Sequence, residues 1–515
     1  MGRTMSRLRR AALATAVVQG FSLLGMALSF LTIPLYLKWL GNERYGLMLT
    51  AQACAGYLAF SDAGLSWSSL LLISQAHGCD DRDEIARIVR NSLSLAGVSA
   101  LVVVAATVGA CVLLRFGASF LPLPTSNPES LGLAVAIGLQ VIVALGSSPI
   151  FNIFLGLQES HLTAIYQGIG RIAGVGASLG AAAAGRSVGL VVLAGVSGPL
   201  LAVLACAAHV WRRHPWTLQA GPFWDRKQIR LQYRTGAKSL ALQIGRVLVG
   251  SAPVFAISSQ AGAAFVPGFT VALTLLNMPL NVTNSFNATL QAGYGEAVGR
   301  GDFPWVGATI RGILRNTLLL QMLLAAGFLV LAGPTITLWA RGRLAVTPEL
   351  LWSALVAGLM SSTFGAFQFA LSGVNRHKVA GASELLDGLF ALALCALAVR
   401  FFGYARVGLG VLVAGLATSG WILPRQIRRH LRVERLWPSV GFFLALAAAG
   451  SVAALAGRLL LAAGPAAMPG LPWLTLVCAG SVIAAVYAGL LRALLPEDAA
   501  RLVGVLRRRE PARSR

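Results

Sequence analysis

A few charged side chains fall well inside long apolar stretches of the chain: Arg171, Arg246, Asp62, Glu384 and Asp387. An ionisable group at the centre of a bilayer costs about 2.5–3.5 kcal/mol on insertion scales, so it normally faces a polar cavity or a partner. Arginine binds phosphate oxygens through two parallel hydrogen bonds. Arg171 and Arg246 are therefore candidate ligands for a phosphate-bearing substrate. The alternative is that each pairs with an acidic neighbour, such as Asp62 or Asp387, and only joins helices.

The three carboxylates allow more than one role each. Asp62, in the sequence Ser61-Asp62-Ala63-Gly64, could cap a helix that restarts after a break, or it could titrate during a transport cycle. Glu384 and Asp387 are three residues apart and therefore share one face of a helix. Their spacing suits proton handling or a cation site, and pairing with Arg171 explains them equally well.

The composition is that of a membrane protein. The chain has 515 residues, of which 56% are hydrophobic and 12% are charged, and its mean hydropathy is +0.73. These values lie outside the range of soluble globular proteins. The net charge of +24 would suggest nucleic acid binding in a soluble protein, but the basic residues here gather in alternate loops. Six single cysteines without a C-x-x-C pair predict neither a disulfide framework nor a metal site.

Fourteen apolar runs are long enough to cross a bilayer, which requires roughly 20 residues per helix. They are residues 11–36, 47–74, 91–114, 131–155, 163–184, 188–210, 236–259, 264–290, 317–340, 349–373, 379–399, 407–424, 438–462 and 472–491. With the N-terminus inside, 30 of the 42 Lys and Arg residues fall in cytoplasmic segments, 9 in outer segments and 3 in spans. Because basic residues are retained on the cytoplasmic side, this distribution predicts that both termini are cytoplasmic.

The stretch from Ile33 to Ser74 is a membrane hairpin, and part of its pattern returns once. An offset of 221 relates Gly41 to Gly262 and Asp81 to Asp302, and an offset of 217 relates Gly156 to Gly373. A repeated order of elements is typical of transporters built from two related halves. We therefore expect an all-α polytopic membrane protein with about 14 transmembrane helices, arranged as two pseudo-repeated six-helix lobes and two C-terminal helices. The predicted parts are an N-terminal lobe (1–210), a basic cytoplasmic linker (211–235), a C-terminal lobe (236–436), and two extra helices with a basic tail (437–515).

Short motifs within this framework carry a family resemblance. They are Leu35-Tyr36-Leu37-Lys38-Trp39-Leu40-Gly41 with Tyr45-Gly46, then Ser61-Asp62-Ala63-Gly64-Leu65, then Gly295-Glu296-Ala297 followed by Gly301-Asp302. In combination they resemble the oligosaccharide flippases, which form the polysaccharide transporter branch of the multidrug, oligosaccharidyl-lipid and polysaccharide exporter superfamily. The resemblance covers most of residues 10–430.

The resemblance implies two bundles around a central cavity and a specific activity. Such a protein turns a polyprenyl-diphosphate-linked oligosaccharide from the inner to the outer leaflet of the bacterial plasma membrane, for the export of surface polysaccharide. The implied partners are that lipid-linked substrate, membrane lipid and other membrane proteins of polysaccharide assembly, without nucleic acid or a cofactor. Relatives often carry an acidic residue where this chain has Ser251, followed by Pro253. Whether H+ or Na+ is coupled to transport is therefore open.

Two other function classes fit the sequence less well. A cation-coupled exporter of small molecules or drugs, from the same superfamily, would need acidic residues as the dominant charges inside its lobes, and here two arginines compete with them. A membrane enzyme such as a polysaccharide polymerase would present a long outer loop with paired Arg or His, whereas all six histidines fall at cytoplasmic loops or span ends. We therefore expect neither catalytic nor metal-binding residues.

Overall fold

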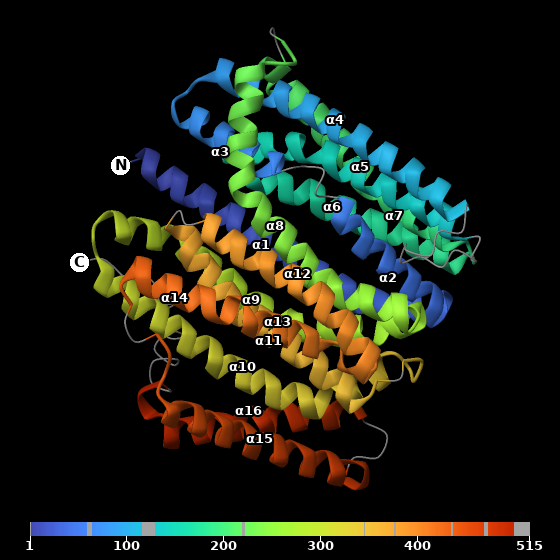
Figure 1. The fold of residues 1–515 in the computed structure, drawn as a ribbon, viewed down its shortest axis with the longest axis vertical. Helices are drawn as coiled ribbons and strands as arrows, with labels where there is room; N and C mark the ends of the chain where they lie inside the picture. The colour runs from blue at the N-terminus through green and yellow to red at the C-terminus, as the bar shows by residue number, and fades with distance from the viewer. Residues whose placement is uncertain are drawn as a thin grey trace. The chain divides into compact units, whose positions relative to one another are not determined.

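The computed structural model describes residues 2–58, 64–115, 129–218, 222–344, 346–374, 377–433, 436–467 and 472–498. These residues form helices joined by short turns, and no strand occurs among them (Figure 1). The helices fall into two compact units, Met1–Pro267 (unit 1) and Gly268–Arg515 (unit 2). The prediction of an all-α protein is confirmed.

Unit 1 is a helical bundle in which α5 lies between α4 and α7, and α7 packs in turn on α6 (Figure 1). Its core gathers buried apolar side chains from α3, α4, α5 and α7, among them Ile73, Ile85, Phe154 and Cys206. The elements of the unit are α1 (Gly2–Trp39), α2 (Gly41–Leu58), α3 (Leu65–Gly78), α4 (Arg82–Arg115), α5 (Glu129–Gly156), α6 (Ser160–Ala183), α7 (Val188–Arg213), η2 (Pro215–Leu218), α8 (Arg226–Gln260) and η3 (Ala263–Phe265).

Unit 2 has two apolar cores. One lies among α9, α10, α11 and α14, and the other joins α10 to the C-terminal helices α15 and α16, which pack on each other. Tyr487 of α16 donates a hydrogen bond to the carbonyl oxygen of Leu319 in α10 at 2.6 Å. The elements are α9 (Val266–Gly299), α10 (Phe303–Trp339), α11 (Pro348–Gly373), α12 (His377–Phe402), η4 (Tyr404–Arg406), α13 (Gly408–Ala417), α14 (Ser419–Leu431), α15 (Val440–Ala467) and α16 (Pro472–Leu494).

Twelve helical segments in the described part of the chain are long and apolar enough to cross a membrane. Each coincides with one of the fourteen predicted spans. The other two predictions, 47–74 and 163–184, fall on helices that do not meet this standard, so the count of fourteen is not confirmed. The predicted span 47–74 is divided between α2 and α3. The predicted span 163–184 lies in α6, which is long enough but rich in glycine and alanine.

The helices related by the predicted repeat begin in the same way in both halves. α4 begins at Arg82 and α10 at Phe303, which is the offset of 221 that relates their sequences. Before α4, a side-chain oxygen of Asp81 accepts the backbone N–H of Glu84 at 2.9 Å, and before α10, Asp302 accepts that of Trp305 at 3.1 Å. A carboxylate in this position satisfies a backbone donor that the helix leaves unpaired. The shared geometry supports the predicted repeat.

The compact units do not divide at the predicted linker. α8 begins at Arg226, inside the segment 211–235, and packs on α2 and α3 within unit 1. Gln232 of α8 donates to the carbonyl oxygen of Ile88 at 3.1 Å, and the backbone N–H of Asp225 donates to the side chain of Asn91 at 2.8 Å. The predicted boundaries at residues 210 and 235 mark the sequence repeat, whereas α8 packs with unit 1. As domain boundaries they stay a prediction.

Candidate functional site

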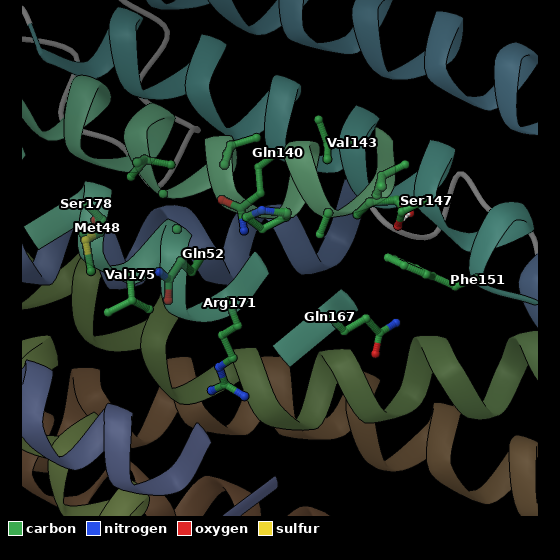
Figure 2. A pocket seen from close by; sticks show the side chains of 18 of the residues that line it. Met48, Gln52, Gln140, Val143, Ser147, Phe151, Gln167, Arg171, Val175 and Ser178 are labelled. Carbon is green, nitrogen blue, oxygen red and sulfur yellow. Dashed lines mark hydrogen bonds between the residues drawn. The ribbon is translucent and has the colours of Figure 1, made fainter. Parts of the chain in front are cut away.

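Unit 1 contains a cavity of about 420 Å³ between five of its helices (Figure 2). Its volume is within the range of small-molecule sites. Most of the surface is apolar, and the polar side chains come from α1, α2, α5 and α6. The lining residues are Tyr36, Met48, Gln52, Gln140, Val143, Ala144, Ser147, Phe151, Gln167, Arg171, Gly174, Val175, Ser178, Val192, Gly195, Val196, Pro199, Ala202 and Val203.

One wall of the cavity is the crossing of α6 and α7, where the two backbones approach closely. A Cβ atom added to Gly198 would lie 2.1 Å from the backbone nitrogen of Gly174 and 2.2 Å from the carbonyl oxygen of Gly170. Only glycine fits such a contact, and small residues at this spacing are the usual means by which membrane helices come together. The short distance between α6 and α7 fixes which face of α6 is turned to the cavity.

Arg171 is exposed on α6, and among the residues that the structure describes no other charged side chain lines the cavity. Its guanidinium group lies over Gly25 of α1, where an added Cβ would come within 2.7 Å of Nη1. The group also donates a long hydrogen bond, of 3.4 Å, to the hydroxyl of Ser29. Figure 2 shows the side chain extending away from Gln140 of α5. The missing side chain at Gly25 thus leaves space for the guanidinium group.

Three glutamines share this cavity with Arg171, and the sequence reasoning did not single them out. Gln52 belongs to α2, Gln140 to α5 and Gln167 to α6. A signal for them was present, because each is an uncharged polar residue inside or next to a predicted span. The sequence did not indicate that these three side chains would line the same cavity.

Arg246 is placed differently. It is exposed on α8 and is not among the residues that line the cavity. Its neighbour Val247 faces α2, where an added Cβ at Gly56 would lie 3.0 Å from the Val247 side chain. The structure therefore brings Arg171, but not Arg246, into the cavity of unit 1. A substrate role for Arg246 stays a prediction.

Asp62 lies outside the described residues, so neither its capping role nor its titration is tested. The flanking helices end at Leu58 and begin at Leu65. Gly64, the residue before α3, has a φ of 77° and packs so closely on α8 that an added Cβ would lie 2.5 Å from the carbonyl oxygen of Gly236. Both the positive φ and the close approach require glycine at this position.

Glu384 and Asp387 are buried in α12 of unit 2, where neighbouring helices supply hydrogen-bond donors. The amide of Gln368 in α11 donates to Glu384. Asp387 accepts from the hydroxyl of Thr418 and, at 2.6 Å, from that of Ser419. These two hydroxyls stand at the break between α13 and α14. Asp387 therefore stabilises the backbone at this break. Ion coupling through Glu384 and Asp387 stays a prediction.

No group of three or more His, Cys, Asp or Glu side chains in the described segments could hold a metal ion. All six cysteines are free. The polar groups that converge on the unit 1 cavity are one cation and several neutral donors and acceptors. Such a set can bind an anion together with hydroxyl groups.

Comparison with known proteins gives a family and a fold. A family model described as polysaccharide biosynthesis protein matches residues 11–290, which is more than half of the chain. No curated protein sequence matches the chain.

Three solved structures define the fold. The lipid II flippase MurJ in an inward closed conformation has a TM-score of 0.68 at 12% identity, covering 93% of this chain and 100% of its own. An inward-facing multidrug resistance transporter of the MATE family and MOP superfamily has a TM-score of 0.57 at 15% identity, with 79% and 96% covered. A MOP superfamily transporter from Pyrococcus furiosus has a TM-score of 0.54 at 13% identity, with 83% and 96% covered. The fold is thus that of membrane transporters and flippases.

Proposed function

Because the chain belongs to the polysaccharide biosynthesis protein family, we propose that it is a flippase for polyprenyl-diphosphate-linked oligosaccharide. It moves this lipid from the inner to the outer leaflet of the bacterial inner membrane, by alternating access, for the export of surface polysaccharide. The protein spans the membrane many times, with both termini in the cytoplasm. The fold that it shares with a lipid II flippase supports a lipid-linked substrate.

The observation that carries the proposal is the position of Arg171. Among the described residues it is the one charged side chain that lines the cavity, on a helix that the sequence predicts to span the membrane. A charge within the membrane raises the free energy of the protein unless a partner or a substrate interacts with it. A diphosphate loses its hydration when it enters a membrane protein, and a guanidinium group replaces part of that hydration with two hydrogen bonds to phosphate oxygens.

Transport in one direction requires that ligands bind the inward and outward states unequally. The diphosphate supplies one such ligand. A coupling ion, either H+ or Na+, would supply a second, and the candidates for its site remain Asp62, Glu384 and Asp387. Arg246 remains a second candidate for the diphosphate on the exposed side of α8.

The test is the pool of lipid-linked intermediates in a strain that lacks the gene. Mass spectrometry of extracted polyprenyl-diphosphate lipids is combined with an assay for the leaflet that holds them, and the strain carries wild type, Arg171→Ala or Arg246→Ala. We expect oligosaccharide lipid to build up on the inner leaflet. Wild type should clear it, and Arg171→Ala should clear it about tenfold more slowly, since a charge-assisted contact is lost.

One result would contradict the proposed function and another the assignment of the arginines. If no lipid-linked oligosaccharide accumulates and drug or dye efflux falls instead, the protein is a small-molecule exporter of the same superfamily. If the lipid accumulates and both arginine variants clear it at the wild-type rate with equal expression, the flippase activity stands and neither arginine binds the diphosphate.

A further inference from the structure

The uncharged side of the unit 1 cavity has a chemistry of its own. Gln52, Gln140 and Gln167 present three amides from three helices. An amide carries both donors and acceptors. Gln52 and Gln167 are exposed and Gln140 is partly buried, so the amides are accessible to a ligand in the cavity. All three glutamines and Arg171 line the same cavity, and Figure 2 labels them on the helices that surround it.

We propose that these three glutamines form a binding subsite for one uncharged pyranose ring, the sugar attached directly to the diphosphate. This inference rests on the proposed function. Sugar hydroxyls are at once donors and acceptors, and an amide pairs with them in both senses. Among the lining residues only Arg171 is charged, and it is assigned to the diphosphate. The remaining polar groups are therefore matched to a ring without a charge of its own.

The spacing along α6 relates the sugar to the phosphate. Gln167 precedes Arg171 by one turn, which separates the two residues by about 6 Å along the helix axis. Residues four apart share a helix face. A phosphate held by Arg171 would therefore place a ring bonded to it beside Gln167.

α5 provides the opposite wall with a matching stripe. Gln140, Ser147 and Phe151 all line the cavity, at intervals of seven and four residues that repeat on one face of a helix. Gln140 and Ser147 offer polar contacts, and Phe151 offers an apolar face for the carbon-bound hydrogens of a sugar ring. Gln52 of α2 completes the set from a third direction.

The volume limits how much of an oligosaccharide this subsite can hold. A cavity of about 420 Å³ is near the lower end of the range for small-molecule sites. It is too small for a whole repeat unit. The glutamines therefore determine selectivity for the ring nearest to the lipid and contribute nothing to the recognition of the distal sugars.

Binding of defined lipids to the purified full-length protein in nanodiscs tests the subsite. The probes are undecaprenyl diphosphate alone and the same lipid bearing glucose, N-acetylglucosamine or glucuronic acid. We expect wild type to bind the two neutral sugar lipids more tightly than the bare lipid. Gln140→Met and Gln167→Met should each weaken the binding of a neutral sugar lipid about threefold to tenfold, because one neutral hydrogen bond is lost. Their binding of the bare lipid should be unchanged.

The controls separate this inference from the proposed function. Gln75→Met, on an exposed position of α3 away from the cavity, should leave all affinities unchanged. Arg171→Gln should weaken the binding of all four lipids by the same factor. The subsite is refuted if the glutamine variants bind the sugar lipids as wild type does, if they weaken the bare lipid equally, or if the sugar adds no affinity. If wild type binds none of the four lipids, the proposed function fails and the subsite fails with it.

Discussion

The fifth predicted span of each half carries a charge at nearly the same place, and the two charges are used differently. These spans are α6 in unit 1 and α12 in unit 2. The offset of 217 that relates Gly156 to Gly373 relates Arg171 to position 388, next to Asp387. Arg171 is exposed to a cavity, whereas Asp387 is buried with only 7% of its surface exposed.

The difference lies in the helix that follows each span. α7 is continuous and meets α6 through glycines beside Arg171, while the polar contact between the two helices, from Tyr166 to His209 at 2.9 Å, does not involve Arg171. The corresponding helix in unit 2 is interrupted at Thr418, between α13 and α14. Asp387 accepts both hydroxyls at that break. A charge at nearly the same position can thus be accessible to a ligand or can stabilise a helix break, depending on whether the neighbouring helix is continuous.

The largest expected effect is on the stability of unit 2. Asp387→Ala removes the acceptor of two buried hydroxyls, and we expect the free energy of unfolding to fall by about 2–3 kcal/mol. Thr418 limits the loss, because its hydroxyl also reaches the carbonyl oxygen of Ala414 at 2.8 Å. The measurement is thermal unfolding of the purified protein in detergent.

Asp387→Asn sharpens this result, because an amide oxygen still accepts a hydrogen bond but cannot titrate. We expect Asp387→Asn to retain most of the stability and most of the transport rate. Full stability combined with abolished transport would contradict a purely structural role and favour ion coupling at Asp387.

A smaller effect is expected on ligand binding in unit 1. Gly25→Val places side-chain atoms where the guanidinium group of Arg171 now lies, and this long side chain can move without unfolding the bundle. We expect the affinity for undecaprenyl diphosphate to fall about threefold to tenfold, because Arg171 keeps its charge but its guanidinium group is moved from its present position. The matched control is Gly20→Val on the same helix, where an added Cβ meets nothing within 4 Å. Equal loss in both variants would point to a general effect on α1.

The smallest effect is a pH dependence at the end of α7, outside the spans. Burial lowers the pKa of His214 below its usual 6.5, although Glu159, whose Oε2 lies 3.7 Å from the histidine Nε2, acts in the opposite direction. The folded protein therefore favours neutral His214. Stability is retained above pH 6.5 and decreases as the pH falls below that value, where unfolded histidine takes up a proton more readily.

The comparison of wild type with His214→Asn isolates this contribution. Melting temperatures between pH 7.5 and 5.5 should decline slightly more steeply for wild type than for the variant. Parallel curves would show that His214 does not contribute to the pH dependence.

Much of the architecture was predictable from the sequence because it depends on local patterns. Apolar runs of sufficient length identified twelve helices that the structure confirms, and the aspartates at 81 and 302 stand where two related helices begin. Length, hydropathy and capping chemistry act over a few residues, so they can be read along the chain. The interruption of the second span was not predicted from hydropathy, because the apolar run 47–74 continues from α2 into α3.

The site depended on tertiary structure. The sequence identified Arg171 and Arg246 as equivalent kinds of residue, and only the packing of α6 on α7 and α1 distinguished them by placing Arg171 at the cavity. A membrane helix is apolar on all sides, so its hydrophobic pattern does not indicate which face meets a neighbour. The sequence by itself determined that charges lie within long apolar stretches of the chain. The rotation of each helix, set by close contacts such as that at Gly198, decided that Arg171 lines one cavity with three glutamines and that Asp387 accepts hydrogen bonds from two hydroxyls.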